Sequence, residues 1–429
     1  VILPEKPPRA EQGILDLSGW SFQEKGSVPL SGQWEFYWNS LLHPSDFEKA
    51  GTPLPSGNFT VPGTWNRYRI DGKALGGKGF ATFRLKVITG GGNEDMALSI
   101  KTVSTAMRLY VNGDEVTSTG KVARTEGDSI PAYHSHIIRV GDLPEEFDII
   151  MQVSNYHYRS GGPWREIRFG KYPEIQKSFV VGNALSFIFF GGILIMAMYH
   201  LTMYCIRRND IHFLLFSVFC LLVAARGLAT GDYLIEHIAP SIPFHTIIRM
   251  EYLSYMLAIP VFGWFMLELF SDYVSKVAIC AITAVSCLFA LSVCVTPVYA
   301  FTHFIMPFNV VAIISSVFYI TIIFIAAMRR HQDSRIFLIG FIILFLAFIN
   351  DYLHNSFIIQ TLNTIDAGLF LFIFTQAYTL SRRFTRAFND IEFMSMELRD
   401  LNINQEKIIE QRAGELLEKQ RQIERQLQL

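Results

Sequence analysis

The hydrophobic and polar positions divide the chain into three parts. Residues 1–178 mix short apolar stretches with turn-forming residues, residues 179–381 consist mainly of long apolar runs, and residues 382–429 are charged and rich in Gln. A membrane-spanning helix needs about twenty mainly apolar residues. The middle part therefore predicts seven spans, at about 179–206, 211–230, 247–270, 274–296, 303–327, 336–359 and 364–381.

Basic residues gather in alternate loops between the predicted spans. These loops carry Arg207, Arg208, Lys276, Arg329, Arg330, Arg335, Arg382, Arg383 and Arg386. The other loops, at 231–246, 297–302 and 360–363, contain no Lys or Arg. Because basic loops remain in the cytoplasm, the pattern predicts an N-terminal part outside the membrane and a cytoplasmic C-terminus. Seven spans require the same arrangement.

Residues 14–170 carry the pattern of a β domain. The stretches "GFATFRLKVI" (79–88), "MALSIK" (96–101), "AMRLYVN" (106–112) and "FDIIMQVSN" (147–155) are rich in β-branched and aromatic residues and alternate with Gly, Pro and Asp. The Asn112-Gly113 pair is a strong signal for a tight hairpin turn. The pattern predicts an antiparallel sandwich or jelly roll.

A polar and aromatic segment, "SNYHYRSGGPWREIRFG" (154–170), closes this domain directly before the first predicted span, and we expect it to form the last β-hairpin. Sugars are bound by aromatic faces together with planar polar side chains. The segment and the neighbouring "PAYHSH" (131–136) supply such a set. The candidate ligand-binding residues are His157, Arg159, Trp164, Arg165, Tyr133, His134 and His136.

Two alternatives remain open for these residues. The 157–165 group is equally suited to contact the membrane-proximal loops or a second protomer, and strand alternation requires some of Tyr156, Tyr158 and Trp164 to be core. A metal site on the three histidines is disfavoured by their spacing and by the lack of an acidic neighbour. The sequence predicts no metal site and no cofactor.

Other chemistries find little support in the sequence. No pair of placed carboxylates, His-Glu-x-x-His segment, nucleophile elbow or phosphate-binding loop is recognisable, so no catalytic residue is assigned. The net charge of −1 gives no indication of nucleic-acid binding. All five Cys lie in the apolar part, which excludes a disulfide framework in the N-terminal domain.

Several charged and polar residues fall within the predicted spans, where they are costly and often functional. They are Arg226, Arg249, Glu251, Asn350, Asp351 and His354. All lie in the outer third of their spans and predict a polar cluster at the outer mouth of the bundle, as a ligand pocket or as a joint with the N-terminal domain. Arg249 and Glu251 are equally compatible with interfacial residues that reach water. Arg226 and Asp351 are predicted to pair.

The C-terminal part carries an apolar seam with heptad spacing. The first residues of the seam are Ile391, Met394, Leu398 and Leu401. The seam then continues with its phase displaced by one residue, through Ile409, Leu416, Ile423 and Leu427. This pattern predicts a parallel two-stranded coiled coil and therefore a homodimer. The predicted domains are residues 1–176 (β sensor domain), 177–385 (seven-helix domain) and 386–429 (coil).

The order of several motifs resembles a known family. "VPGTWN" (61–66), "GFATFRLKV" (79–87), "LYVNGDEV" (109–116) and "VSN" (153–155) together resemble the galactose-binding-like jelly roll that serves as the sugar-binding domain of family 2 glycoside hydrolases. With "LSGQWEFYWNSLLHPSDF" (30–47) and seven spans, residues 1–385 resemble bacterial seven-transmembrane receptors with diverse intracellular signalling modules, carrying the second type of their extracellular domain.

This resemblance implies a receptor of the bacterial inner (plasma) membrane, surrounded by membrane lipid. It would sense a carbohydrate-like or other small ligand outside and signal through the coil to an output domain beyond residue 429. In the family that domain is a kinase, cyclase or phosphatase, so whether the full-length protein is an enzyme stays open. The alternative is a membrane-anchored scaffold or adhesion module that binds an envelope glycan or a protein without signalling.

Overall fold

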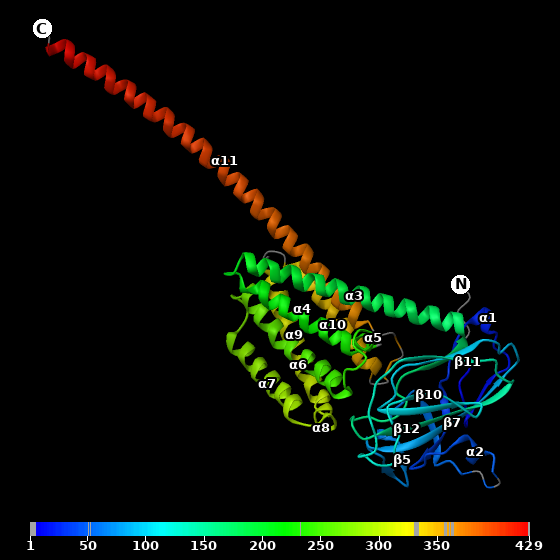
Figure 1. The fold of residues 1–429 in the computed structure, drawn as a ribbon. Coiled ribbons are helices and arrows are strands. Elements are labelled where there is room, and N and C mark those ends of the chain that lie inside the picture. The colour runs from blue at the N-terminus through cyan, green and yellow to red at the C-terminus, as the bar shows by residue number, and fades with distance from the viewer. Residues whose placement is uncertain are drawn as a thin grey trace. The chain divides into compact units, whose positions relative to one another are not determined.

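The computed structural model describes residues 6–427 except 50, 52, 232, 330–333, 356–357, 360 and 362–363, and at 355, 380, 383–384, 424 and 426–427 it describes only the backbone. Two compact units are distinguished, Val1–Ala326 and Ala327–Leu429. Each unit is described by itself. The elements are labelled in Figure 1.

The first unit begins with a sandwich of two main sheets. The larger sheet has the order β10-β9-β12-β7-β3-β4, with β1 parallel to β7, and the smaller has the order β11-β8-β13-β2. The larger sheet contains β1 (Ile14–Leu17), β3 (Gly32–Trp38), β4 (Gly57–Val61), β7 (Gly79–Thr89), β9 (Ala106–Val111), β10 (Asp114–Thr119) and β12 (Glu146–Asn155). The smaller contains β2 (Val28–Pro29), β8 (Met96–Ile100), β11 (His136–Gly141) and β13 (Ile167–Lys171). The sandwich domain also contains a short two-stranded ribbon, formed by β5 (Arg69–Ile70) and β6 (Lys73–Ala74). Its three short helices are α1 (Phe22–Lys25), α2 (Pro44–Phe47) and η1 (Trp65–Arg67).

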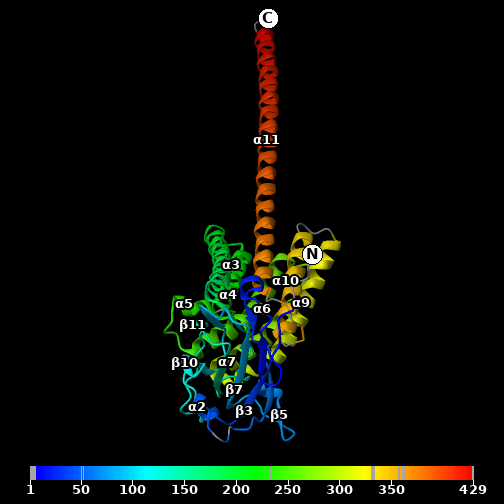
Figure 2. The same ribbon diagram turned by 90° about the vertical axis from the view of Figure 1, so that its right-hand side faces the viewer.

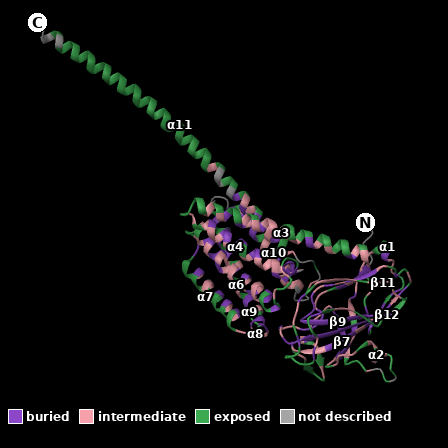
Figure 3. Ribbon diagram, in the orientation of Figure 1, coloured by how far each residue is buried: buried purple, intermediate pink, exposed green. Residues whose placement is uncertain are grey.

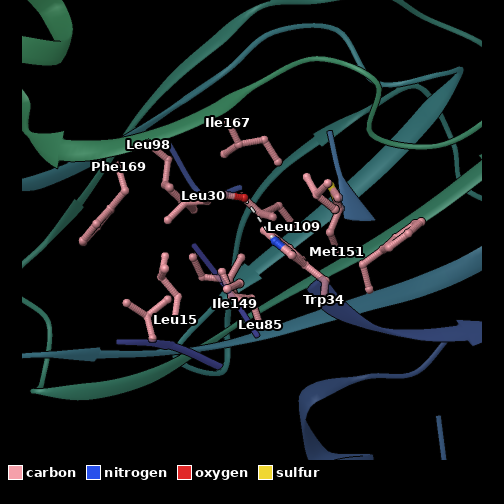
Figure 4. Close-up of a cluster of buried hydrophobic side chains, with 14 of the residues drawn as sticks. Leu15, Leu30, Trp34, Leu85, Leu98, Leu109, Ile149, Met151, Ile167 and Phe169 are labelled. Carbon is pink, nitrogen blue, oxygen red and sulfur yellow. Dashed lines mark hydrogen bonds between the residues drawn. The ribbon is translucent and has the colours of Figure 1, made fainter. Parts of the chain in front are cut away.

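The side chains between the two sheets form the sandwich core. Figure 4 shows Trp34 and Leu109 of the larger sheet facing Leu98 and Ile167 of the smaller one. Trp34 is completely buried, and its indole N–H donates to the carbonyl of Leu30 at 3.1 Å. The hydrogen bond lets this large ring be buried without an unsatisfied donor.

The structure confirms the four quoted strands and the turn at Asn112-Gly113, where φ is +49° and +94°. The expected closing hairpin is wrong. β12 pairs with β7 and β9, whereas β13 pairs with β8 and β2, so residues 156–166 cross from one sheet to the other. Alternation identifies a strand and its buried face but does not identify its neighbour.

Among the described residues, seven helices follow the sandwich, and the last of them ends two residues past the boundary of the first unit. They are α3 (Tyr172–Ile206), α4 (Ile211–Ala229), α5 (Leu234–Ile238), α6 (Phe244–Leu269), α7 (Lys276–Val295), α8 (Val298–Thr302) and α9 (Ile305–Met328). α3 packs on α4, α4 on α6 and α6 on α7, as Figures 1 and 2 show.

The sandwich passes into α3 without a linker. β13 ends at Lys171 and α3 begins at Tyr172, and the Glu174 carboxylate in the first turn accepts from the Ser27 backbone N–H at 2.9 Å. The Lys171 ammonium donates to the carbonyls of Gly92 and Glu94 at 2.6 and 2.8 Å. These bonds fix the direction of α3 relative to the smaller sheet.

The second unit consists of α10 (Ser334–Asn355) and α11 (Ile365–Leu427), which pack against each other. α11 has 63 residues and begins with the apolar segment Ile365–Thr379. Among the described residues, six helices are long and apolar enough to cross a membrane, and this shorter segment corresponds to the seventh predicted span.

The distal part of α11 is exposed in the single chain (Figure 3). The seam side chains whose placement is described are 53–67 % exposed, namely Ile391, Met394, Leu398, Leu401, Ile409, Leu416 and Ile423. The side chain of Leu427 lies outside the described residues. The structure therefore shows one continuous helix here, and the coiled coil stays a prediction.

Candidate functional site

Residues 156–166, the crossing loop, are held by two asparagines that belong to the motifs described above. The Asn155 amide donates to the carbonyls of Gly77 and Tyr158, each at 2.7 Å, and its oxygen accepts from the Tyr158 backbone N–H at 3.2 Å. The Asn66 amide donates to the Arg159 carbonyl at 2.7 Å and accepts from the Gly161 backbone N–H at 3.2 Å. The motifs "VPGTWN" and "VSN" thus end in residues that shape this loop.

The Gly-Gly-Pro turn allows the crossing loop to lie against the core. A Cβ atom on Gly161 would collide with the ring of Trp65, and Gly162 has φ of +109°, which favours glycine. The Gly63 backbone N–H donates to the Pro163 carbonyl at 2.9 Å. The loop is thereby closely positioned by the sandwich.

The crossing loop and residues 129–136 contact α5 and α6 through buried aromatic rings. The hydroxyls of Tyr158 and Tyr252 lie 3.1 Å apart, and these two side chains are 8 % and 2 % exposed. Tyr133 packs edge-on against Phe244 with ring centroids 4.9 Å apart, and lies 5.1 Å from the Tyr233 ring. These rings belong to one cluster that continues between the helices, so the sandwich and the bundle share an apolar contact.

His134 contacts the same region through a carboxyl group. Its Nδ1 lies 3.1 Å from Oε2 of Glu236 in α5. Burial and the nearby His237 lower the pKa of His134, and burial raises the pKa of Glu236 to about 7. The separation would suit an ion pair, but burial disfavours both charges.

Three arginines interact electrostatically with the carboxyl group of Glu251 in α6. Arg159 and Arg165 come from the crossing loop and Arg226 from α4, and all three attract this carboxylate. Arg226 also donates to the Glu251 carbonyl at 3.3 Å and lies 4.7 Å from the centre of the Tyr255 ring. We call Arg159, Arg165, Arg226 and Glu251 the arginine cluster.

Some donors in and beside the arginine cluster have no hydrogen-bond partner although they are buried. They are the Nε atoms of Arg159 and Arg165 and the indole Nε1 of Trp164. The guanidinium of Arg165 lies 5.0 Å from the centre of the Trp164 ring. The guanidinium of Arg159 interacts electrostatically with Tyr158 and Tyr252.

The other candidate residues take different positions. His157 Nε2 lies 3.3 Å from the carbonyl of Ser129, and its ring centroid is 6.2 Å from that of His245 in α6. His136 lies 2.6 Å from the Thr119 hydroxyl within the sandwich, and burial lowers its pKa to about 4. Of the seven candidates, Tyr133, His134, His157, Arg159 and Arg165 contact the helices or interact with their residues, whereas His136 lies against Thr119 and Trp164 against Arg165.

The polar residues of the predicted spans fall into both units. Arg249 donates to the Thr296 carbonyl at 3.3 Å in the first unit. In the second unit the Asp351 carboxylate accepts from the backbone N–H groups of Thr364 at 2.7 Å and Ile365 at 3.1 Å, which caps α11. The predicted pair of Arg226 and Asp351 joins residues of separate units and stays a prediction.

Two further polar residues of α10 lie near the beginning of α11. Asn350 donates to the Thr364 hydroxyl at 3.1 Å, and His354 Nδ1 accepts from the Thr361 backbone N–H at 3.3 Å. Together with Asp351 they hold the connection between α10 and α11. Within the described part of the chain, no group of three His, Cys, Asp or Glu side chains is arranged to bind a metal ion.

Several contact residues were not singled out in the sequence, among them Tyr233, Glu236 and Tyr252. Glu236 and Tyr233 lie in a loop without basic residues, and Tyr252 lies directly after Glu251 in a predicted span. The grouping of Tyr233, Tyr252 and Tyr255 near one end of the bundle was the available signal, since tyrosine suits sites that are apolar on one side and polar on the other.

The fold and its apolar helices define a membrane protein with an N-terminal β sandwich. Residues 182–383 match the 7TM diverse intracellular signalling family, and this part of the chain belongs to that family. A comparison with curated proteins finds no match.

The sandwich region is also similar to parts of solved enzyme structures. A family 2 β-galacturonidase from Eisenbergiella tayi bound to galacturonate is 17% identical, with 34% of this chain and 24% of that chain covered and a TM-score of 0.25. A β-glucuronidase from Ruminococcus gnavus is 15% identical, with 33% and 28% covered and a TM-score of 0.26. The chain thus spans about a quarter of the length of these enzymes.

Proposed function

We propose that the chain is a transmembrane signalling receptor whose sandwich lies outside the bacterial inner membrane and acts on a cytoplasmic output domain through α11. The family match supports a membrane signalling protein. The observation that carries the proposal further is the contact of the crossing loop with α6, centred on the hydroxyls of Tyr158 and Tyr252. A scaffold without signalling is not favoured, because the family is defined by intracellular signalling.

Two attachments of different kinds support transmission from the sandwich to the helices. One is the continuous passage from β13 into α3, held by Glu174 and Ser27. The other is the aromatic contact of the loop residues with α5 and α6. A change in the sandwich that alters one attachment relative to the other moves α3 against α6. Ligand binding that favours one of two such arrangements shifts their populations.

The ligand is proposed to be an extracellular, carbohydrate-like or other small molecule that contacts the crossing loop. His157, Arg159, Trp164 and Arg165 supply an aromatic face and planar polar groups there, with Tyr133, His134 and His136 nearby. Because five of these seven residues also face the helices or interact with them, a ligand at this position would act directly on the second attachment.

The tail is proposed to form a parallel homodimeric coiled coil. Its seam side chains are more than half exposed in one chain, and complete burial of a Leu or Ile side chain is worth about 1.5–3 kcal/mol. Pairing two seams therefore supplies a substantial driving force for a dimer. The displaced phase between Leu401 and Ile409 suits a helix that rotates during signalling.

Disulfide cross-linking tests the dimeric tail. The exposed native cysteines, Cys205, Cys280, Cys287 and Cys294, are first replaced by Ser. In membranes, Leu416→Cys should form an intermolecular disulfide rapidly because this position lies on the seam. Glu418→Cys is the matched control two residues away on the opposite face of the helix, where cross-linking should be slow. Equal rates at both positions, or faster cross-linking at 418, would contradict the coil.

A further inference from the structure

We propose that the arginine cluster, together with Trp164, binds an oxyanion, namely a carboxylate or phosphate group of a small ligand. This inference rests on the proposed receptor function and specifies the chemistry of its ligand. The site lies between the crossing loop and helices α4 and α6. A ligand held there would touch the sandwich and the bundle at the same time.

The first argument is charge. The cluster contains three guanidinium groups and the one carboxylate of Glu251, and arginine remains protonated in proteins. The other acidic side chain at this contact, Glu236, lies against His134. Among the described residues that interact with Glu251, positive charge therefore exceeds negative charge. A partly buried excess of charge is unfavourable unless a counter-charge is supplied.

The second argument is the set of unused donors. The Nε atoms of Arg159 and Arg165 and the Nε1 of Trp164 are buried without a partner. A buried donor without a partner costs free energy, so an orphaned set in one loop calls for an acceptor. A guanidinium binds carboxylate or phosphate through two parallel hydrogen bonds, and an indole N–H can only donate. An acceptor-only group with several oxygens fits these three donors.

The third argument is access. The side chains of Arg159, Trp164 and Arg165 are half-buried as a whole, and so is Arg226 on the helix side, although the three unpartnered donor atoms themselves are covered. The rings of Tyr158 and Tyr252 lie beside them and are buried. A site with a partly open polar side and an apolar base suits a small molecule with one anionic group. A cation is excluded by like charge, and a neutral sugar would leave the excess charge uncompensated.

Binding is tested with the full chain in nanodiscs of phosphatidylcholine at constant ionic strength. The probes are inorganic phosphate, citrate and D-glucuronate, with D-glucose as the uncharged counterpart of glucuronate. Calorimetric titration should show binding of at least one oxyanion and none of glucose. Arg165→Gln and Arg159→Gln should each weaken that binding about tenfold or more, since each removes a charged hydrogen-bond donor.

Two further variants separate binding from folding. Arg168→Gln is the matched control, because Arg168 lies three residues from Arg165 but bonds to Glu166 and Ser27, and it should leave the affinity unchanged. Glu251→Gln should tighten oxyanion binding, because it removes the negative charge from the site. A purely structural cluster would instead lose stability in this variant without gaining affinity.

A second arm identifies the source of the oxyanion. If nanodiscs containing phosphatidylglycerol raise the melting temperature of the wild type but not of Arg165→Gln, the oxyanion is a lipid headgroup and the site stands. Absence of any response to the soluble oxyanions and to the lipid overturns the proposal, as does a response that is equal in Arg165→Gln and Arg168→Gln. Such a failure leaves the receptor function untouched, because the cross-linking experiment on the tail does not depend on the ligand.

Discussion

The hydroxyl contact between Tyr158 and Tyr252 offers a direct measure of how strongly the sandwich is attached to the bundle. The two oxygens lie 3.1 Å apart in a buried environment. Replacing either tyrosine by Phe removes one hydroxyl and keeps the ring packing. The guanidinium of Arg159 also interacts with both tyrosines.

The expected magnitude follows from this geometry. A buried neutral hydrogen bond contributes about 0.5–1.5 kcal/mol, so each single variant should lose about 1 kcal/mol. Both variants break the same bond, and the double variant should therefore lose less than the sum by about 0.5–1.5 kcal/mol. For a domain of the size of the sandwich, about 1 kcal/mol corresponds to a shift of about 2–4 °C in melting temperature.

Thermal unfolding of the full chain in detergent micelles, followed by tryptophan fluorescence, provides the assay. Five of the six tryptophans lie within the first 164 residues, so the signal reports mainly on the sandwich. Tyr37→Phe is the control, because its hydroxyl donates to Glu35 within β3, and it should be additive with Tyr252→Phe. Strict additivity of Tyr158→Phe and Tyr252→Phe would refute the attachment.

The remaining predictions concern a titrating contact, a helix cap and the shape of the loop. Burial raises the folded-state pKa of Glu236 to about 7, so the stability of the wild type should fall as the pH rises from about 4.5 to 7. Glu236→Gln cannot ionise and should therefore melt at a higher temperature than the wild type above about pH 7. Near pH 4 the two proteins should melt at about the same temperature. Loss of this difference would contradict the buried carboxyl. Asp351→Ala removes the cap of α11, which should cost about 1 kcal/mol and speed amide exchange in the first turn of that helix; unchanged exchange would contradict the cap. Gly161→Ala should destabilise the sandwich by about 1–3 kcal/mol because of its collision with Trp65, and a neutral effect on the melting temperature would contradict the close approach.

The strands and apolar helices were predictable because each depends on a local period. Stretches 79–88 and 147–155 are rich in β-branched and aromatic residues and are flanked by turn-forming residues, which locates β7 and β12, and long apolar runs locate the helices. Pairing partners depend on contacts distant in sequence, which explains why the 154–170 segment was expected to be a hairpin although it crosses between sheets.

The candidate site could be predicted only in part for the same reason. Arg159 and Arg165 were recognised from their unusual neighbours, and Arg226 and Glu251 from their cost inside a span. The interaction of the three arginines with Glu251 depends on the contact between the crossing loop and α6. No local sequence pattern encodes that contact. Glu236 was missed because a single acidic residue in a loop is ordinary until its burial is known.

The central claim is that the attachment of the sandwich to the bundle controls the tail. Its most direct test is the distance between spin labels placed at Glu418 in the two protomers, measured in nanodiscs after removal of the exposed native cysteines. The account predicts that Tyr158→Ala combined with His134→Ala shifts the distance distribution, whereas the control Tyr37→Phe does not. Superimposable distributions for all three proteins would contradict it.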